Sequence, residues 1–350
     1  MSSALDALVD TVRAASAARA PLVIRAGGTK DFHGNETGGD RIDPRGWAGV
    51  VAHEPTELVI TARCGTPLAE IESVLDAAGQ MLPFEPPHFG TGATVGGCVA
   101  AGLAGPRRAS AGGVRDFVLG VKLLTGRGEV LAFGGTVMKN VAGYDVARLA
   151  AGSLGILGVI TEVSLKVLPK PVAEATLRLE LPEAAALKKM NEWAGQPLPI
   201  SATAWHDGLL HVRISGARAA VAEARQKIGG ASVDGAAFWN GLREHQDAFF
   251  TGPGPLWRLA LPSTAPALGL SGTQLIEWSG GQRWLRGDAP ADRIRERAKA
   301  CGGHATLFRG GARRDVFAPL AAPVAAIHRR LKAEFDPAGI FNRGRLYADL

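Results

Sequence analysis

The stretch PLVIRAGGTKDFHG, Pro21 to Gly34, raises the question that decides the fold. An apolar run typical of a β-strand ends at Arg25 and is followed by the adjacent glycines Gly27 and Gly28. A glycine pair is common in ordinary turns, so a plain turn is one interpretation. A glycine-rich turn directly after a strand also lets several backbone N–H groups converge on a phosphate, because no β carbon keeps the anion away. The rest of the chain has to distinguish the two.

Glycine is unusually frequent, and its distribution is informative. The chain has 350 residues, of which 46 are glycine, and they gather between Gly90 and Gly158. That share is well above the usual figure of about 7%. We therefore expect many close backbone approaches in this region. The length predicts two domains with separate cores, because single cores stop growing at roughly 250–300 residues.

Charge and cysteine content exclude several classes of protein. The formal charge is +6, but the basic residues are scattered, so a nucleic-acid-binding protein is not favoured. Small anionic ligands or an acidic partner protein fit this charge as well. The three cysteines, Cys64, Cys98 and Cys301, lie far apart, which excludes an iron–sulfur cluster or a metal site built from them. No signal sequence or membrane-spanning apolar run is present, so we expect a cytoplasmic protein.

Hydrophobic periodicity predicts alternating helices and strands in the first half. Residues 4–18 have the pattern of an amphipathic helix, and residues 22–25 and 58–62 have that of strands. A helix is expected over residues 67–78, with Pro67 in its first turn. Two apolar runs on either side of a Thr-Gly-Arg-Gly turn, within residues 117–135, predict a β-hairpin.

Prolines mark the expected domain boundary. The alternating strand GVITEVSLKVLPKP ends with Pro169 and Pro171, after which glycine becomes less frequent. The following region has further strand patterns and helical patterns over 217–228 and 289–300. It is expected to form a small α/β unit, an antiparallel sheet backed by helices. A helix ending near Phe335 and the turn DPAGIFNRGRLY follow.

Two common nucleotide-binding motifs fit the glycines poorly. A phosphate-binding Walker loop needs G-x-x-x-x-G-K-[ST], and GGTK at residues 27–30 has neither the spacing nor the order. Gly90, Gly92 and Gly96 approximate a Rossmann fingerprint, but the proline-rich PFEPPHF precedes them where that fingerprint requires a strand. Both interpretations are therefore disfavoured.

Four segments together suggest a family. IRAGGTKDFHG (24–34), GTGATVGGCVAAGLAG (90–105), NVAGYDVARLAAGSLGILGVITEVSLKVLP (140–169) and FDPAGIFNRGRLY (335–347) occur in this order. In this the chain resembles FAD-binding proteins of the vanillyl-alcohol oxidase (PCMH) type, most closely the FAD-binding subunits of bacterial glycolate oxidases. The resemblance covers nearly the whole chain and is most specific in its first half.

The resemblance implies an α+β fold with three parts. Residues 1–171 would form a PCMH-type FAD-binding domain of two subdomains. Residues 172–310 would form a smaller α/β cap domain of the ferredoxin-like type. Residues 311–350 would form a terminal helix and turn that return to the FAD domain.

The resemblance also implies which residues contact FAD. The amides around Gly27 to Lys30 would hold the pyrophosphate, Lys30 would add positive charge, and ATVGG would bring a second backbone alongside the cofactor. A packing corner or a core strand are the structural alternatives for the later glycines. The complete set of expected FAD contacts is Ala26, Gly27, Gly28, Thr29, Lys30, Asp31, Gly92, Ala93, Thr94, Val95, Gly96, Gly97, Ala100, Ala101, Gly102, Gly155, Gly158, Val159, Ile160 and Asn342. Arg343 follows Asn342 where the family has proline, which predicts a looser turn.

The chain departs from its relatives at other chemically important positions. Covalent members have a histidine where this chain has Thr29 and Lys30, so we expect noncovalent FAD. The histidine motifs that bind metal in related hydroxy-acid dehydrogenases are missing, so no metal site and no catalytic residue is predicted. His206, His211 and His304 have the character of surface or core histidines. Arg107 and Arg108 are interpreted either as solvated residues or as ligands for a substrate carboxylate or a partner's acidic edge.

The resemblance implies a subunit of a glycolate oxidase complex, which converts glycolate to glyoxylate. A catalytic flavoprotein subunit and an iron–sulfur subunit would be its partners, a small hydroxy acid its candidate substrate, and any contact with the inner membrane would be peripheral and through those partners. Two alternatives remain open here. One is a self-sufficient FAD-dependent oxidoreductase acting on another hydroxy acid or a sugar, and the other is a non-catalytic structural subunit.

Overall fold

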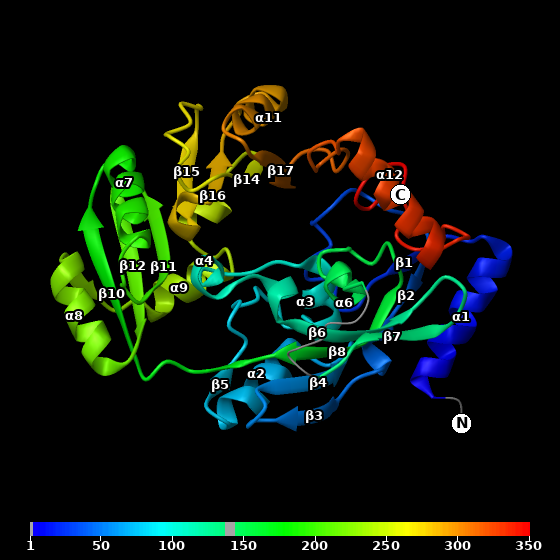
Figure 1. The fold of residues 1–350 in the computed structure, drawn as a ribbon. Helices are drawn as coiled ribbons and strands as arrows, with labels where there is room; N and C mark the ends of the chain where they lie inside the picture. The colour runs from blue at the N-terminus through cyan, green and yellow to red at the C-terminus, as the bar shows by residue number, and fades with distance from the viewer. Residues whose placement is uncertain (1–2, 137–143) are drawn as a thin grey trace.

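Two antiparallel sheets organise the molecule (Figure 1). The computed structural model describes residues 3–136 and 144–350. Residues 140–143, in the third family segment quoted above, lie outside that range. One sheet has five strands in the order β3-β4-β8-β6-β7, and the other has eight. Every strand pair inside these two sheets is antiparallel, so the doubly wound parallel sheet of a Rossmann domain is excluded for the described chain.

The chain begins with a capped helix and a short parallel pair of strands. Helix α1 (Ala4–Ala18) starts at Ser3, whose side chain accepts a hydrogen bond from the Asp6 amide in a capping box. Strand β1 (Leu22–Ile24) pairs in parallel with β2 (Asp40–Ile42). The buried face of α1 packs with Ile340 and Phe341 from the end of the chain. The helix predicted over 4–18 is thus confirmed.

The five-stranded sheet forms the core of the first half. Its strands are β3 (Val50–Glu54), β4 (Val59–Arg63), β6 (Val118–Leu124), β7 (Val130–Gly134) and β8 (Val159–Lys166). Helices α2 (Leu68–Ala77) and α3 (Val95–Ala101) bury Leu68, Ile71 and Val99 in the core that this sheet provides. The predicted β6–β7 hairpin is confirmed, and the predicted helix begins one residue after Pro67.

The eight-stranded sheet consists of two similar halves joined edge to edge. The first half comprises β10 (Ala173–Glu180), α7 (Glu183–Ala194), β11 (Ile200–His206), β12 (Leu209–Gly216), α8 (Arg218–Ile228) and β13 (Ala231–Val233). The second comprises β14 (Leu256–Ala260), β15 (Thr273–Glu277), β16 (Gln282–Arg286), α11 (Ala291–Ala300) and β17 (His304–Arg309). Their strand orders, β13-β10-β12-β11 and β15-β16-β14-β17, are both ferredoxin-like, and β11 pairs with β15.

The predicted antiparallel sheet backed by helices is confirmed, and it contains two ferredoxin-like halves. Helices α9 (Ala236–Arg243) and α10 (Ala248–Thr251) connect the two halves, and a loop replaces the first helix of the second half. Strand β14 was missed because Arg258 interrupts its apolar run.

The end of the chain returns to the first half. Helix α12 (Ala322–Phe335) leads into the terminal turn, as predicted. The buried Lys332 ammonium donates to the carbonyl oxygens of Ile156 and Phe341 and to the Asp336 carboxylate. These hydrogen bonds of Lys332 hold the terminal turn against the loop that precedes β8.

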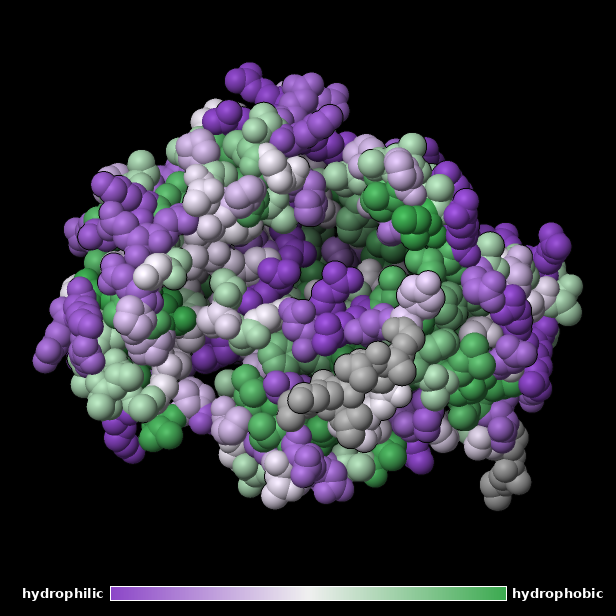
Figure 2. Space-filling model, viewed as in Figure 1, coloured by the Kyte–Doolittle hydropathy of each residue, from purple (hydrophilic) through white to green (hydrophobic). Residues whose placement is uncertain are grey.

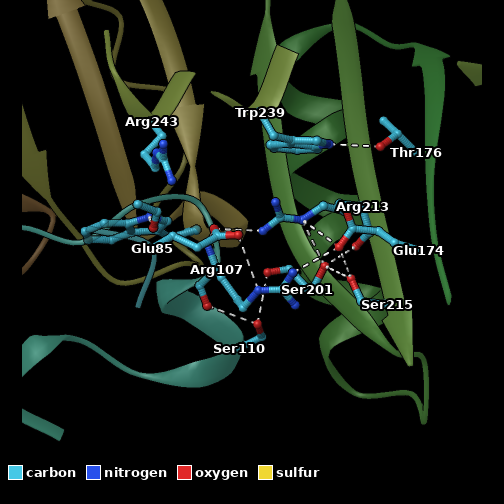
Figure 3. Close-up of polar contacts among 12 residues, drawn as sticks. Glu85, Arg107, Ser110, Glu174, Thr176, Ser201, Arg213, Ser215, Trp239 and Arg243 are labelled. Carbon is cyan, nitrogen blue, oxygen red and sulfur yellow. Dashed lines mark hydrogen bonds and ion pairs between the residues drawn. The ribbon is translucent and has the colours of Figure 1, made fainter. Parts of the chain in front are cut away.

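A cluster of charged side chains joins the two sheets (Figure 3). The Glu85 carboxylate accepts hydrogen bonds from the Arg107 backbone N–H and from the Arg213 guanidinium on β12, each 2.8 Å long. Arg107 also reaches Glu174 on β10. Burial alone would raise the pKa of Glu85, but the charges of Arg213 and Arg107 outweigh it and lower that pKa. Arg107 is therefore a structural link between the halves, whereas its neighbour Arg108 takes no part in the cluster.

Candidate functional site

A cleft opens where β1 ends. Its walls come from the loop after β1, the segment that leads into α3, the loop before β8 and the terminal turn. Figure 2 shows that the molecule is hollowed on this face between the eight-stranded sheet and α12, with hydrophilic side chains inside the hollow. Segments far apart in the sequence therefore meet around one cavity.

The first wall presents a row of free backbone donors. Among residues 3–136 and 144–350, no acceptor is found for the five consecutive N–H groups from Ala26 to Lys30. Gly28 has a φ of +71°, and the Arg25 guanidinium pairs with the Asp31 carboxylate across the loop at 2.6 Å. Arg345 donates to the carbonyl oxygens of Lys30 and Asp31. Successive unpartnered amides in such a loop form an anion-binding concavity.

The second wall is pressed against the first. A β carbon at Gly27 would lie 1.7 Å from the Gly92 carbonyl oxygen, so the first loop needs glycine here. Two residues further on, Thr94 caps α3 by accepting a hydrogen bond from the Gly97 amide. A β carbon at Gly96 would lie 2.6 Å from the β carbon of Cys64, because α3 starts directly on the end of β4.

The third wall is held by Asn342. Its side-chain oxygen accepts a hydrogen bond from the Ile24 N–H at 2.8 Å, and its amide donates to the Leu154 carbonyl at 2.6 Å. A β carbon at Gly155 would lie 2.8 Å from the same amide nitrogen. Asn342 thus connects β1, the loop before β8 and the terminal turn, although Arg343 replaces the expected proline.

Most of the residues expected from the sequence meet in this cleft. Those that line it are Ala26, Gly27, Gly28, Thr29, Lys30, Asp31, Gly92, Thr94, Gly96, Gly97, Ala100, Ala101, Gly155, Gly158, Val159, Ile160 and Asn342. Three others are placed elsewhere: Ala93 and Val95 are buried in the core of the five-stranded sheet, and Gly102 ends α3 with a φ of +64°.

The cleft also has lining residues that the sequence interpretation missed. They are Val23, Ile24, Arg25, Thr37, Pro44, Cys64, Leu154 and Arg345. Arg345 belongs to the quoted terminal segment, so its basic character was an available signal, whereas Pro44 and Cys64 come from segments with no motif. Burial raises the pKa of the Cys64 thiol to about 12, so this side chain stays protonated at neutral pH.

Lys30 points toward the junction with the eight-stranded sheet. Its ammonium lies 3.2 Å from the His88 carbonyl oxygen and 5.6 Å from the centroid of the Phe89 ring. Burial lowers the pKa of Lys30. His33, by contrast, is buried against Phe308 and Phe317 and does not line the cleft.

Two negative findings apply to the described residues. Within 3–136 and 144–350, no group of three or more histidine, cysteine, aspartate or glutamate side chains is arranged to hold a metal ion. Over the same ranges, every helix is too short or too polar to span a bilayer.

Comparison with known proteins identifies the family. Residues 3–146 match the family model described as FAD binding domain. The chain is 52% identical over 345 residues to glycolate oxidase subunit GlcE of Escherichia coli (strain K12), an alignment that covers 99% of this chain and 98% of that protein. The chain belongs to the GlcE family. This confirms the resemblance stated from the sequence.

Two more distant comparisons show how far the similarity in sequence and fold extends. Glycolate oxidase subunit GlcD of Bacillus subtilis (strain 168) is 30% identical over 161 residues, 45% of this chain and 34% of that protein. The structure of alkyldihydroxyacetonephosphate synthase superposes with a TM-score of 0.66 at 16% identity, covering 96% of this chain and 74% of that one. The structural likeness shows the common fold, and with the family match it confirms the PCMH-type architecture.

Proposed function

We propose that this chain is the FAD-binding subunit of a glycolate oxidase complex and that it holds FAD noncovalently in the cleft. The observation that carries the proposal is the row of five unpartnered amides from Ala26 to Lys30. They lie beside a second loop whose Gly92 carbonyl oxygen would be 1.7 Å from a β carbon at Gly27. The family membership established by the GlcE alignment supports the same assignment. FAD supplies the redox chemistry of such a subunit.

The residues of the cleft fit this cofactor in chemical type. The amides of Ala26 to Lys30 would hold the negatively charged pyrophosphate, with Lys30 and Arg345 adding positive charge to the same region. The rest of the FAD molecule would pack against the main chain of Gly92 to Gly97 and of Gly155 to Ile160. Asn342 would hold β1, the loop before β8 and the terminal turn together through its two hydrogen bonds.

The domain division expected from the sequence is part of the proposal. Residues 1–171 would form the FAD-binding domain and residues 172–310 the cap. Residues 311–350 would complete the FAD domain, which the contacts of Lys332 and Asn342 support.

The proposed partners are a catalytic flavoprotein subunit and an iron–sulfur subunit. The relative GlcD, which matches part of this chain, supports an assembly of related subunits. Within the described ranges no group of three or more histidine, cysteine, aspartate or glutamate side chains is arranged to hold a metal ion. We place the chain in the cytoplasm, with peripheral membrane contact only through those partners.

The first test is the release of flavin. The purified chain should be yellow, and acid precipitation should release all of its flavin into the supernatant. Flavin that stays in the pellet would contradict noncovalent binding. A colourless protein that takes up no added FAD would support the non-catalytic structural alternative.

The second test concerns activity. The isolated, FAD-loaded chain should show negligible dye reduction with glycolate, and activity should appear after co-expression with the two proposed partner subunits. Robust glycolate oxidation by the chain alone would favour a self-sufficient enzyme instead. A panel of other hydroxy acids and sugars, monitored by flavin bleaching, would test that alternative directly.

A further inference from the structure

A groove separate from the FAD cleft lies between helix α4 (Arg108–Ala111) and the eight-stranded sheet. It is an open groove between α4 and strands β14 and β17, and it shares no lining residue with the cleft. Its chemically distinctive members are Arg108, Arg258, Trp278 and His304. Arg108 is the residue that the sequence left open between a solvated and a ligand-binding role.

Trp278 brings the two arginines together. The guanidinium carbon of Arg108 lies 4.5 Å from the centroid of the Trp278 ring, and that of Arg258 lies 5.2 Å from it. The indole N–H donates to the Gly105 carbonyl oxygen at 3.1 Å, which fixes the ring to the glycine-rich segment of the other half. Trp278 and Ser279 both have left-handed backbones, with φ of 54° and 55°. Strained backbone of this kind persists where surrounding contacts hold it in place.

The two positive charges line the groove, and within the described ranges neither is held in an ion pair. Arg258 uses its Nε to donate to Gln282 at 2.7 Å, and no acceptor among the described residues is found for its other nitrogens. Burial lowers the pKa of Arg258 to about 10, so it remains charged at neutral pH. Two nearby cations of this kind favour the binding of an anion.

The nearest acidic groups are already engaged. Glu277 accepts hydrogen bonds from the Gln282 amide at 3.0 Å and the Trp284 indole at 2.6 Å. Asp116, the acidic residue beside Arg108, accepts a hydrogen bond from the Gly113 amide at 2.8 Å. Burial lowers the pKa of both arginines; the charge of Asp116 opposes this shift for Arg108, and that of Glu277 opposes it for Arg258. Among the described residues, however, neither carboxylate forms an ion pair with either arginine.

Arg258 also lines a second, much smaller pocket. That pocket is further lined by Glu277, Gln282 and His245. The Nδ1 atom of His245 is buried and has no hydrogen-bond partner among the described residues. A polar ligand that reached Arg258 would thus meet a further unsatisfied polar atom nearby.

We propose that this groove binds a small carboxylate anion, held by the guanidinium groups of Arg108 and Arg258 beside the Trp278 ring. The planar fork of an arginine matches a carboxylate through two parallel hydrogen bonds. The site goes beyond the proposed function, because it uses none of the residues assigned to FAD.

The test is a direct binding titration with the FAD-loaded chain. Malonate, oxalate and glycolate would be titrated by calorimetry, with malonamide as the uncharged analogue of malonate. A dicarboxylate should bind and malonamide should not. Arg108→Gln and Arg258→Gln should each weaken binding about tenfold or more, because each removes charge-assisted hydrogen bonds. Arg314→Gln, which removes an exposed positive charge outside the groove, should leave it unchanged.

Each remaining outcome contradicts the proposal. Arg108 is exposed, so its variant tests the site even if Arg258→Gln fails to fold. Equal affinity in Arg108→Gln and wild type, or equal weakening by Arg314→Gln, would show nonspecific charge. Binding of a glutamate-rich peptide without any free acid would assign the groove to a partner protein. Flavin content is measured separately, so a loss of carboxylate binding can be distinguished from a loss of FAD binding.

Discussion

Gly27 and Gly92 lie so close that neither residue could gain a side chain without moving the other loop. A β carbon on Gly27 would lie 1.7 Å from the Gly92 carbonyl oxygen, and one on Gly92 would lie 3.1 Å from the Gly27 carbonyl oxygen. The contact is backbone against backbone, so no flexible side chain can yield. The absence of a β carbon at Gly27 therefore allows the two main chains to approach this closely.

Gly27→Ala should open this contact and lower both stability and FAD affinity. Overpacking of this kind costs about 1–3 kcal/mol, and here the neighbouring atoms belong to rigid main chain. Thermal unfolding and flavin fluorescence on dilution measure the two effects. Gly38→Ala is the matched control, because a β carbon at Gly38 would meet no atom within 4 Å. Equal behaviour of the two variants would show that the loops yield freely.

Gly28→Asp should abolish FAD binding while the eight-stranded sheet stays folded. A β carbon there would lie 2.6 Å from the Arg25 guanidinium and 3.1 Å from the Asp31 carboxylate, so the new charge would enter the loop that offers its amides to phosphate. Like charges at close range in such a loop are strongly unfavourable. Flavin content after purification is the measurement. Gly79→Asp, also at positive φ but in open space, should retain full flavin occupancy.

Asn342→Asp should weaken FAD binding by loosening the third wall. The variant loses the donor to the Leu154 carbonyl and leaves a carboxylate oxygen facing that carbonyl, at a cost of about 1–3 kcal/mol. Asn191→Asp is the matched control, because the Asn191 amide donates to the Leu187 and Ser263 carbonyls in the other half. The control should lose stability without any change in the dissociation constant for FAD. A parallel loss of affinity in both variants would contradict a specific role for Asn342.

Glu277→Gln should change how stability depends on pH. Burial raises the pKa of Glu277 to about 7, so the folded state holds this proton more tightly than the unfolded state does. The stabilisation is fully present below the ordinary pKa of 4.5 and is lost as pH rises through 7. The total effect is up to about 3 kcal/mol. Urea unfolding at pH 5 and pH 8 should show a smaller difference for the variant than for wild type, and an unchanged difference would refute this assignment.

Local sequence was sufficient for much of the first half. The helix over 4–18 and the β6–β7 hairpin depend on periodicity and turn residues that act within a few positions. The loop after β1 could be interpreted because glycine is required there by main chain that approaches it from Gly92. A requirement of this kind can be recognised in the sequence because glycine is the residue that meets it.

The second ferredoxin-like half could not be predicted in the same way. Its strand β14 contains Arg258, which lines the groove beside α4. This charged residue breaks the apolar pattern that marks a strand. The lining roles of Pro44 and Cys64 were also invisible, because they arise only when β4 and the loop after β2 are brought beside the glycine segments. These features depend on tertiary contacts, which no local pattern records.

Strand β1 lies beside Phe341, and Asn342 closes the wall of the cleft next to it. The loop with the free amides is made early in synthesis, whereas the residue that completes its surroundings is made more than three hundred residues later. During translation the nascent chain therefore carries the loop of free amides before the rest of the cleft is present. The wall formed by Asn342 is complete only when the terminal turn has folded back onto β1, so we expect stable FAD binding to require that step.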